Sequence, residues 1–236
     1  MGKNMDAIRA FIAIELPRDM QTRLVELLHT LKQQIPSGVR WVPGGNIHLT
    51  LKFLGESSPN NIAILSKSLP ALTSRYQSFD FHIEQLGAFP NLRRPRVIWV
   101  GVRAPTVLCD LQRSIERETQ HLGYTPEERS FSPHLTLGRV NQNVTPEEVH
   151  QISTALSQQT VGDLGRVSVE RIVLFRSELL PSGARYTPLA NATLSKVNSK
   201  STTFLKRWCL AGWGKRIRTS KTRSCVCCPA IRRAPT

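Results

Sequence analysis

The sequence predicts a fold that mixes β-strands with α-helices and contains one supersecondary unit twice. Its 236 residues are enough for one substantial domain or two small lobes with an ordinary core. Segments with strand-like and helix-like periodicity alternate along the chain. The tetrapeptide His-Leu-Thr-Leu occurs at residues 48–51 and again at residues 134–137, each time on a predicted strand that follows a helix and a short loop.

The first half is predicted to begin with a strand, a helix and a hairpin. Residues 7–16 are rich in β-branched and aromatic side chains, as in a buried strand, and Pro17 ends this strand. The next segment is predicted to be helical because its apolar residues recur at steps of three and four, at Leu24, Leu27, Leu28, Leu31 and Ile35. Residues 39–42 and 46–54 read as strands around Pro-Gly-Gly, which places the first motif on a strand.

The order then repeats. A second helix over residues 60–72 and an alternating strand over 79–89 complete the first half. An apolar strand over 97–102 opens the second half, and a helix with one apolar face runs from about residue 106 to residue 122. The strand over 131–140 then carries the second motif.

A further helix is predicted to begin after Thr145. Thr145 is followed by Pro146 and, three residues after the threonine, by Glu148, which is the pattern of a capping box. Residues 165–179 and 184–190 are predicted to close the body as strands on either side of a turn.

The positive charge is concentrated in a C-terminal tail. The formal net charge is +15, but the segment from Lys196 onward holds eleven Lys and Arg residues and no Asp or Glu. Because this tail also lacks periodicity, we predict that it is disordered. Its cysteines lack the paired spacing of a zinc ribbon, so no zinc is expected at Cys209, Cys225, Cys227 and Cys228.

No segment is predicted to enter a membrane. The longest apolar run near the N-terminus, residues 10–16, is short and contains Glu15, so it reads as a strand and not as a signal peptide. We therefore expect a cytoplasmic monomer without a membrane partner. Its cysteines are expected to be reduced, and Cys109 is expected to serve as packing.

The repeated motif predicts a paired catalytic site. Side chains alternate between the two faces of a strand, so His48 and Thr50 share one face, as do His134 and Thr136. If the two strands face each other across a groove, their two hydroxyls can donate to phosphate oxygens while one imidazole accepts a proton and the other donates one. This chemistry suits a phosphodiester and requires no metal. The alternative is that both histidines only pack in the core.

The segments "HLTLKFLG" and "PHLTLGR", with "FPNLRRPRVIWVGV" between them, resemble the two-histidine phosphoesterases. Within that superfamily they are similar to the RNA 2′,3′-cyclic phosphodiesterases, also called 2′-5′ RNA ligases. The resemblance covers residues 5–194 and leaves 195–236 as the basic tail. It implies a bilobal, pseudo-twofold α+β fold, with two mainly antiparallel sheets and outer helices around a central cleft.

The resemblance also implies an activity and its residues. The activity is hydrolysis of a terminal 2′,3′-cyclic phosphate to a 2′-phosphate, with reversible 2′-5′ joining in some members. His48 and His134 take the acid and base roles. We assign His48 as the proton donor and His134 as the proton acceptor, and the symmetry of the two motifs leaves the reverse assignment open. Thr50 and Thr136 contact the phosphate, and Arg139 assists there. The expected partner is RNA with a cyclic end, tRNA fragments among such RNAs, and no cofactor or metal is expected.

Other residues are candidates from spacing alone. Lys52 lies two residues beyond Thr50, so it is expected on the same strand face, where it would add a cation to the site. Trp41, Phe53 and Phe89 can stack on a terminal base, but core packing is favoured for each.

Other functions fit the same motifs. One is a phosphodiesterase for 2′-5′ oligonucleotides or small cyclic nucleotides, and another is a module that binds RNA ends without turnover.

Overall fold

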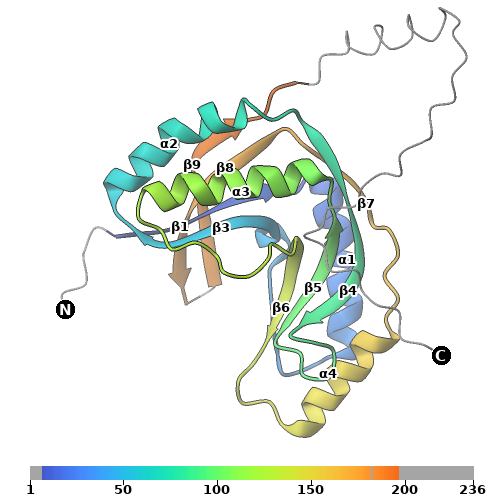
Figure 1. Cartoon of the computed structure of the whole chain (residues 1–236). Helices are drawn as coiled ribbons and strands as arrows, with labels where there is room; N and C mark the ends of the chain where they lie inside the picture. The colour runs from blue at the N-terminus through green and yellow to red at the C-terminus, as the bar shows by residue number, and fades with distance from the viewer. Residues whose placement is uncertain (1–6, 182, 197–236) are drawn as a thin grey trace, which may run out of the picture.

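The computed structural model describes residues 7–181 and 183–196 (Figure 1). The helices are α1 (Arg18–Gln34), α2 (Pro59–Thr73), α3 (Thr106–His121) and α4 (Pro146–Gln158), with a short 3-10 turn, η1 (Gly44–Asn46). The strands are β1 (Ile8–Glu15), β2 (Val39–Trp41), β3 (His48–Ser57), β4 (Phe79–Phe89), β5 (Val97–Arg103), β6 (His134–Val140), β7 (Gly165–Val169), β8 (Arg171–Leu180) and β9 (Gly183–Thr193). The α+β class predicted from the sequence is confirmed.

The strands form one curled antiparallel sheet. Its order is β7-β4-β5-β6-β3-β1-β8-β9, and β2 pairs with β6 beside this path. The two motif strands, β3 and β6, are neighbours at the middle and share a single register pair, Leu49 with Leu135. The two expected sheets are therefore two halves of one sheet that meet at the motif strands.

The predicted duplication is visible in the topology. The unit β1-α1-β3-α2-β4 recurs as β5-α3-β6-α4-β8, and the sheet order is symmetric when β1 is matched with β5 and β3 with β6. The last strand of each unit crosses to the other half, because β4 pairs with β5 and β8 pairs with β1. Each half of the sheet is thus built from both halves of the sequence.

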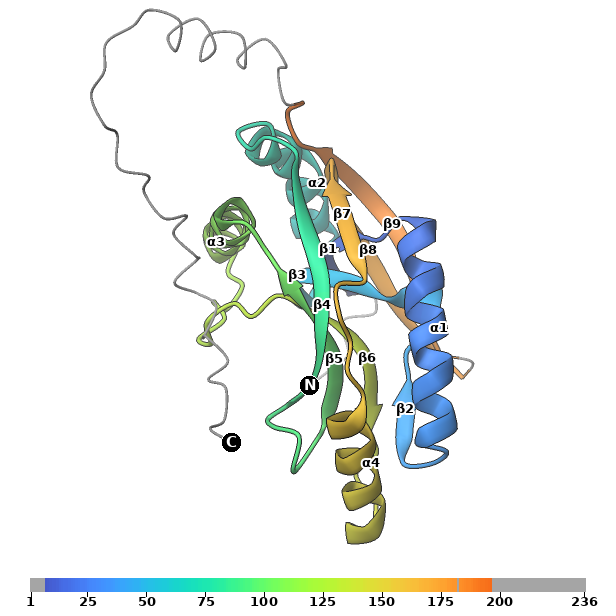
Figure 2. The same cartoon turned by 90° about the vertical axis from the view of Figure 1, so that its right-hand side faces the viewer.

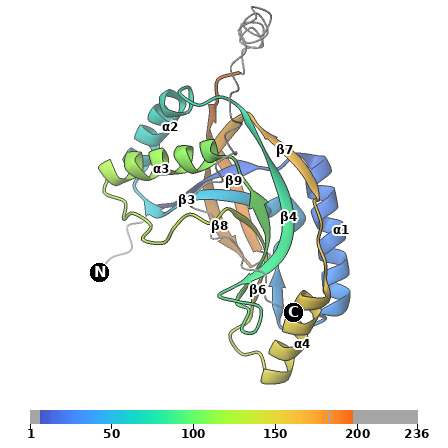
Figure 3. The ribbon, with the colours of Figure 1, turned by 45° about the vertical axis from the view of Figure 1, so that its right-hand side comes forward.

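The helices pair in the same crossed manner. Helix α3 packs against β3, and α2 packs against α3, β8 and β9, whereas α1 packs against α4. In Figures 2 and 3 the α2–α3 pair lies toward the upper left and the α1–α4 pair toward the lower right. The predicted apolar face of α1 is buried through Leu24, Leu28 and Leu31.

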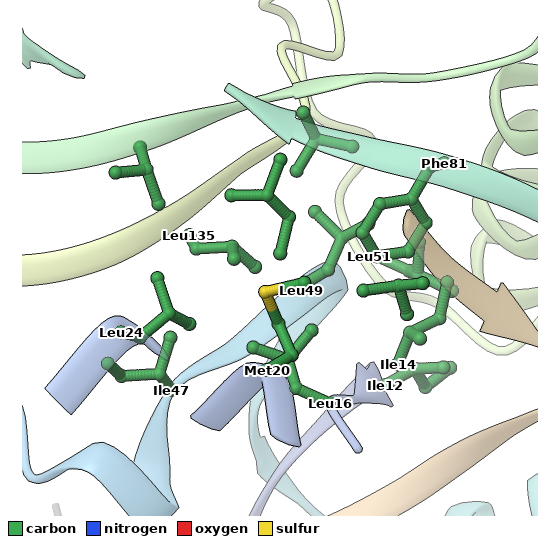
Figure 4. Close-up of a cluster of buried hydrophobic side chains, with 14 of the residues drawn as sticks. Ile12, Ile14, Leu16, Met20, Leu24, Ile47, Leu49, Leu51, Phe81 and Leu135 are labelled. Carbon is green, nitrogen blue, oxygen red and sulfur yellow. The ribbon is translucent and has the colours of Figure 1, made fainter. Parts of the chain in front are cut away.

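One hydrophobic core joins both halves. Figure 4 shows Leu49 and Leu135 side by side within it, together with Ile12 and Ile14 of β1 and Met20 of α1. Because the motif leucines are fully buried, they anchor both motif strands at the centre of the molecule. The other residues of each motif are thereby held on a rigid support.

The structure can be compared with the helix starts predicted from the sequence. The predicted capping box is present in α4: the Thr145 hydroxyl accepts from the Glu148 amide at 3.2 Å, and the Glu148 carboxylate accepts from the Thr145 amide at 2.9 Å. Helix α2 begins one residue before the predicted start, because Ser58 caps it and Pro59 takes its first position. Cys109 is buried as expected, and the tail cysteines lie outside the described residues.

Among the described residues no helix is long and apolar enough to cross a membrane.

Candidate active site

The two motifs meet on one face of the sheet. Leu49 and Leu135 are opposite each other and point into the core, so the residues on either side of each leucine point to the other face. We call this the motif face, and it carries His48, Thr50, His134 and Thr136, all half-buried. The structure thus brings together all four predicted motif residues, on neighbouring strands.

The residue opposite Thr50 confirms the direction of the motif face. Thr50 lies opposite Ala13, which belongs to a second apolar cluster, separate from the main core, with Phe11, Val173 and Phe175. This cluster packs beside the motif on the β1–β8 half of the sheet. One of its residues, Phe11, packs directly against His48.

Both imidazoles are oriented in the same way. The Nδ1 atom of His48 lies 2.8 Å from the carbonyl oxygen of Asn46, and Nδ1 of His134 lies 2.7 Å from that of Ser132. A carbonyl can only accept, so Nδ1 must carry the hydrogen in each ring. The Nε2 atom of each ring is therefore the one that gains or loses a proton, which is the requirement for general acid–base chemistry.

Both histidines are biased toward the neutral form. Burial lowers the pKa of His48 below its ordinary value, against an opposing effect of the hydrogen bond to Asn46. Burial also lowers the pKa of His134, and the positive charge of Arg139 lowers it further, again opposed by a backbone hydrogen bond. Only His134 has a cation among these causes, so the two rings are not equivalent.

A β-bulge follows the first motif. Ala13 of β1 faces Thr50, but the preceding residue, Ile12, faces Lys52, which leaves Leu51 as an extra residue in β3. An extra residue reverses the face to which the following side chains point. Since Ile12 lies in the main core, Lys52 points to the core side of the sheet.

The prediction that Lys52 shares the face of Thr50 is therefore wrong. Lys52 is only 6% exposed, and its Nζ donates to Oε2 of Glu116 at 2.6 Å and to the carbonyl of Thr125 at 2.8 Å. Gln112 donates to the other oxygen of Glu116 at 3.0 Å. The lysine charge is neutralised inside the protein, where it ties β3 to α3 and to the segment that leads into the second motif.

The second motif has the same bulge. Trp99 of β5 faces Thr136, but the residue before Trp99 faces Gly138, so Leu137 is the extra residue in β6. A Cβ atom on Gly138 would lie 2.9 Å from the ring of Trp41, which is closer than real Cβ contacts. Trp41 therefore takes the space that a side chain would need, and it packs against the main core as favoured above.

The bulges give Phe53 and Arg139 equivalent places on the motif face. The order of half-buried, buried and exposed positions is the same from His48 to Phe53 as from His134 to Arg139. Phe53 is 67% exposed, and its ring centroid lies 6.3 Å from that of Phe11. Core packing of Phe53 is thus excluded, and its ring is available to a ligand.

Aromatic rings border the two histidines differently. His48 is stacked on Phe11 at 4.7 Å and meets the ring of Tyr186 edge-on at 5.3 Å. His134 is met edge-on by Phe89 at 5.0 Å, with Trp99 at 6.4 Å. Phe89 therefore packs against His134 of the second motif, not in the main core.

Tyr186 is a further candidate site residue, which lies beside His48 and which the sequence did not indicate. Burial raises its pKa, so its hydroxyl stays protonated, while the charges of Arg139 and Arg9 oppose that rise. The residue comes from β9, far along the chain from both motifs, and no spacing links it to them. Asn46, which precedes the first motif, donates to the carbonyl of Ala184 at 2.7 Å and so holds the start of β9 beside the site.

A family model for LigT-like phosphoesterases matches residues 14–99 and 102–186. The chain belongs to the LigT-like phosphoesterase family. Each matched segment contains one copy of the motif, in agreement with the duplicated topology.

Curated relatives share most of this length. An RNA 2′,3′-cyclic phosphodiesterase of Methanothermobacter thermautotrophicus is 33% identical over 182 residues, which are 77% of this chain and 96% of the relative. The Escherichia coli K12 protein of the same name is 30% identical over 189 residues, with 80% and 97% covered.

Solved structures share the fold. The protein TT0787 of Thermus thermophilus superposes with a TM-score of 0.67 at 26% identity, covering 81% of this chain and all of that protein (100%). E. coli LigT complexed with 3′-AMP superposes with a TM-score of 0.61 at 28% identity, covering 80% of this chain and 98% of that one.

Within residues 7–181 and 183–196, no three His, Cys, Asp or Glu side chains gather in a way that could hold a metal ion.

Proposed function

We propose that this protein is an RNA 2′,3′-cyclic phosphodiesterase that opens a terminal 2′,3′-cyclic phosphate to a 2′-phosphate. The observation that carries the proposal is the paired arrangement on the motif face. Two imidazoles hold Nδ1 against a backbone carbonyl and keep Nε2 available, and a threonine stands two residues after each. The names of the curated relatives support the same substrate.

The four motif residues divide the reaction between them. The hydroxyls of Thr50 and Thr136 donate to the non-bridging phosphate oxygens, where charge grows in the transition state. Nε2 of His134 takes a proton from water as the water oxygen bonds to phosphorus. The bond to the 3′ oxygen breaks, and that oxygen takes the proton of Nε2 of His48. The product is a 2′-phosphate with a free 3′ hydroxyl.

The environment of each ring favours this assignment of roles. A general base must start neutral, and the cation of Arg139 disfavours protonation of His134 in addition to burial. His48 has no such cation among the causes of its shift. The negative phosphate itself would raise the pKa of both rings on binding, which allows the acid to be protonated in the complex.

The side chains around the motifs suit the rest of a nucleotide. Arg139 is exposed on the motif face, where its guanidinium can neutralise the phosphate. Phe53 is exposed on the other half and can stack on the terminal base. These residues would favour a nucleotide over a simple phosphodiester.

The decisive experiment is product analysis on an RNA oligonucleotide with a 2′,3′-cyclic end. We expect a 2′-phosphate, and we expect turnover to persist in excess EDTA. A 3′-phosphate would overturn the assigned geometry of attack, and loss of activity in EDTA with recovery on added metal would overturn the metal-free mechanism. No turnover together with tight binding of the RNA end would favour the binding-module alternative.

Other predictions stay open for the same assays. Joining of RNA ends through a 2′-5′ bond uses the same acid and base, so it can be measured with one RNA that ends in a 2′,3′-cyclic phosphate and a second RNA with a 5′-hydroxyl. Parallel assays on 2′-5′ oligonucleotides and on cyclic mononucleotides test the narrower substrate alternatives. The monomeric state and the cytoplasmic location stay predictions.

A further inference from the structure

Two arginines lie directly opposite each other at the edge of the candidate site. Strand β2 pairs with β6 so that Arg40 faces Arg139, with Trp41 opposite Gly138 as the next pair. Trp41 packs toward the main core, so by alternation Arg40 and Arg139 point to the motif face. Both arginines are exposed.

Such a pair is unfavourable without a ligand. Like charges directly opposite on neighbouring strands repel. Several other exposed arginines of the sheet have carboxylate partners, for example Arg103 with Glu84, and Arg171 with Glu15. No carboxylate of the described residues lies within ion-pair distance of Arg40 or Arg139. A bound anion would remove the repulsion, which is why the pair points to a ligand.

The pair lies beyond the reacting phosphate, along the same strand. Strand β2 occupies the edge of β6 that β3 uses at Leu135, so β3 and β2 follow one another along that edge. From Thr136 to Arg139 the chain advances by three residues, or about 10 Å in a strand. Arg139 can turn back toward the catalytic phosphate, and Arg40 then faces whatever lies further along the substrate.

We propose that Arg40, beside Arg139 at the catalytic phosphate, forms a second phosphate subsite for the phosphodiester that joins the terminal nucleotide to the rest of the RNA strand. The inference rests on the proposed function and deepens it, since it names what distinguishes a polynucleotide end from a cyclic mononucleotide. A cyclic mononucleotide has no such phosphodiester and leaves the subsite empty. The guanidinium geometry suits phosphate, and the charge makes binding dependent on salt.

The test compares two substrates in one variant. For Arg40→Gln, the ratio of kcat/KM on a cyclic-ended RNA oligonucleotide to kcat/KM on adenosine 2′,3′-cyclic phosphate should fall about tenfold, through KM for the RNA. The dependence of log kcat/KM on log salt should lose a slope of about 0.7, as for one phosphate contact with a single strand. Arg40→Lys should retain the salt slope, because it keeps the charge.

The control is Arg75→Gln, which removes another exposed arginine, two residues after the end of α2. It should change neither the ratio nor the slope. An unchanged ratio in Arg40→Gln would overturn the proposal. An equal loss on both substrates would also overturn it, because Arg40 would then act on the terminal phosphate or on the fold, and melting temperature separates these two.

A binding assay tests the subsite independently of the proposed activity. Anisotropy of a labelled RNA oligonucleotide with a terminal 2′-phosphate needs no turnover, and Arg40→Gln should weaken it about tenfold. If the wild-type protein hydrolyses neither substrate but shows this loss, the proposed function fails and the subsite stands. If it hydrolyses RNA ends and Arg40→Gln binds them as well as the wild type does, the subsite fails and the function stands.

Discussion

The two half-sites, one around His48 and one around His134, share a backbone and differ in their side chains. Both have an imidazole held through Nδ1 by the carbonyl two residues earlier, a threonine two residues later, and a bulge directly after it. The repeated backbone explains how one short motif, used twice, can supply both an acid and a base. The duplication of the motif thus provides the two imidazoles that general acid–base chemistry needs.

The side chains after the bulge break this symmetry. At the two equivalent positions the first half has Lys52 and Phe53, whereas the second has Gly138 and Arg139. The first half therefore has an exposed aromatic ring at Phe53, and its lysine is neutralised in the interior. The second half has an exposed cation beside its histidine. We infer that the difference orients the substrate, with the base toward Phe53 and the phosphates toward Arg139.

Removal of either imidazole is expected to have the largest effect. His48→Ala and His134→Ala should each lower kcat on a cyclic-ended RNA by at least about a hundredfold, the lower end of a general acid–base contribution. Single-turnover assays and thermal melts on the same samples check this. Loss of melting temperature in proportion to activity would instead indicate a packing role for that histidine.

Breaking the buried ion pair between Lys52 and Glu116 should lower the stability of the protein. Lys52→Met leaves the Glu116 carboxylate without its cation and should lower the free energy of unfolding by about 3 kcal/mol, measured by urea denaturation. Adding Glu116→Leu should recover most of that loss, because no buried charge remains unpaired. Lys32→Met, at an exposed site on α1, is the matched control. A stable Lys52→Met protein would contradict the buried pairing.

Phe53 tests the aromatic border. Phe53→Ala should raise KM for a cyclic-ended RNA about tenfold, since stacking of a base on an aromatic ring contributes about 1–3 kcal/mol. The melting temperature should hardly change, because the ring is 67% exposed. Phe53→Leu keeps apolar bulk without a ring and should show a similar rise in KM. Recovery of wild-type KM in Phe53→Leu would argue against stacking.

A smaller expected effect is a selective pKa change. Arg139→Gln removes a charge that lowers the pKa of His134, so that pKa should rise, while the pKa of His48 should stay where it is. Titration of the imidazole Hε1 signals by NMR resolves the two rings. Equal movement of both pKa values would show that Arg139 does not distinguish the half-sites.

Lowered histidine pKa values also make stability fall in acid. Each folded-state pKa lies below the ordinary value of 6.5, so below pH 6.5 the unfolded chain binds more protons than the folded one. The stability present above pH 6.5 is therefore lost as the pH falls toward the folded-state pKa. Replacing His48 by Asn should reduce this acid sensitivity in urea titrations at several pH values.

Local sequence determined the parts of this protein that depend on neighbouring residues. The leucines of α1 specify its buried face, and the capping box specifies the start of α4 at Thr145. Alternation within a strand places each motif histidine on the same face as its threonine, because the side-chain period is two wherever no residue is inserted. The repeat of the motif then indicated a paired site before any tertiary contact was known.

Only the tertiary structure decided what depends on pairing between distant strands. A bulge exists only relative to a partner strand, so the interior position of Lys52 and the exposed position of Phe53 could not be derived from the spacing in β3. Tyr186 reaches His48 only because β8 crosses to pair with β1 and carries β9 with it. Arg40 faces Arg139 through the register of β2 on β6, and register is set by non-local hydrogen bonds and core packing that no local pattern encodes.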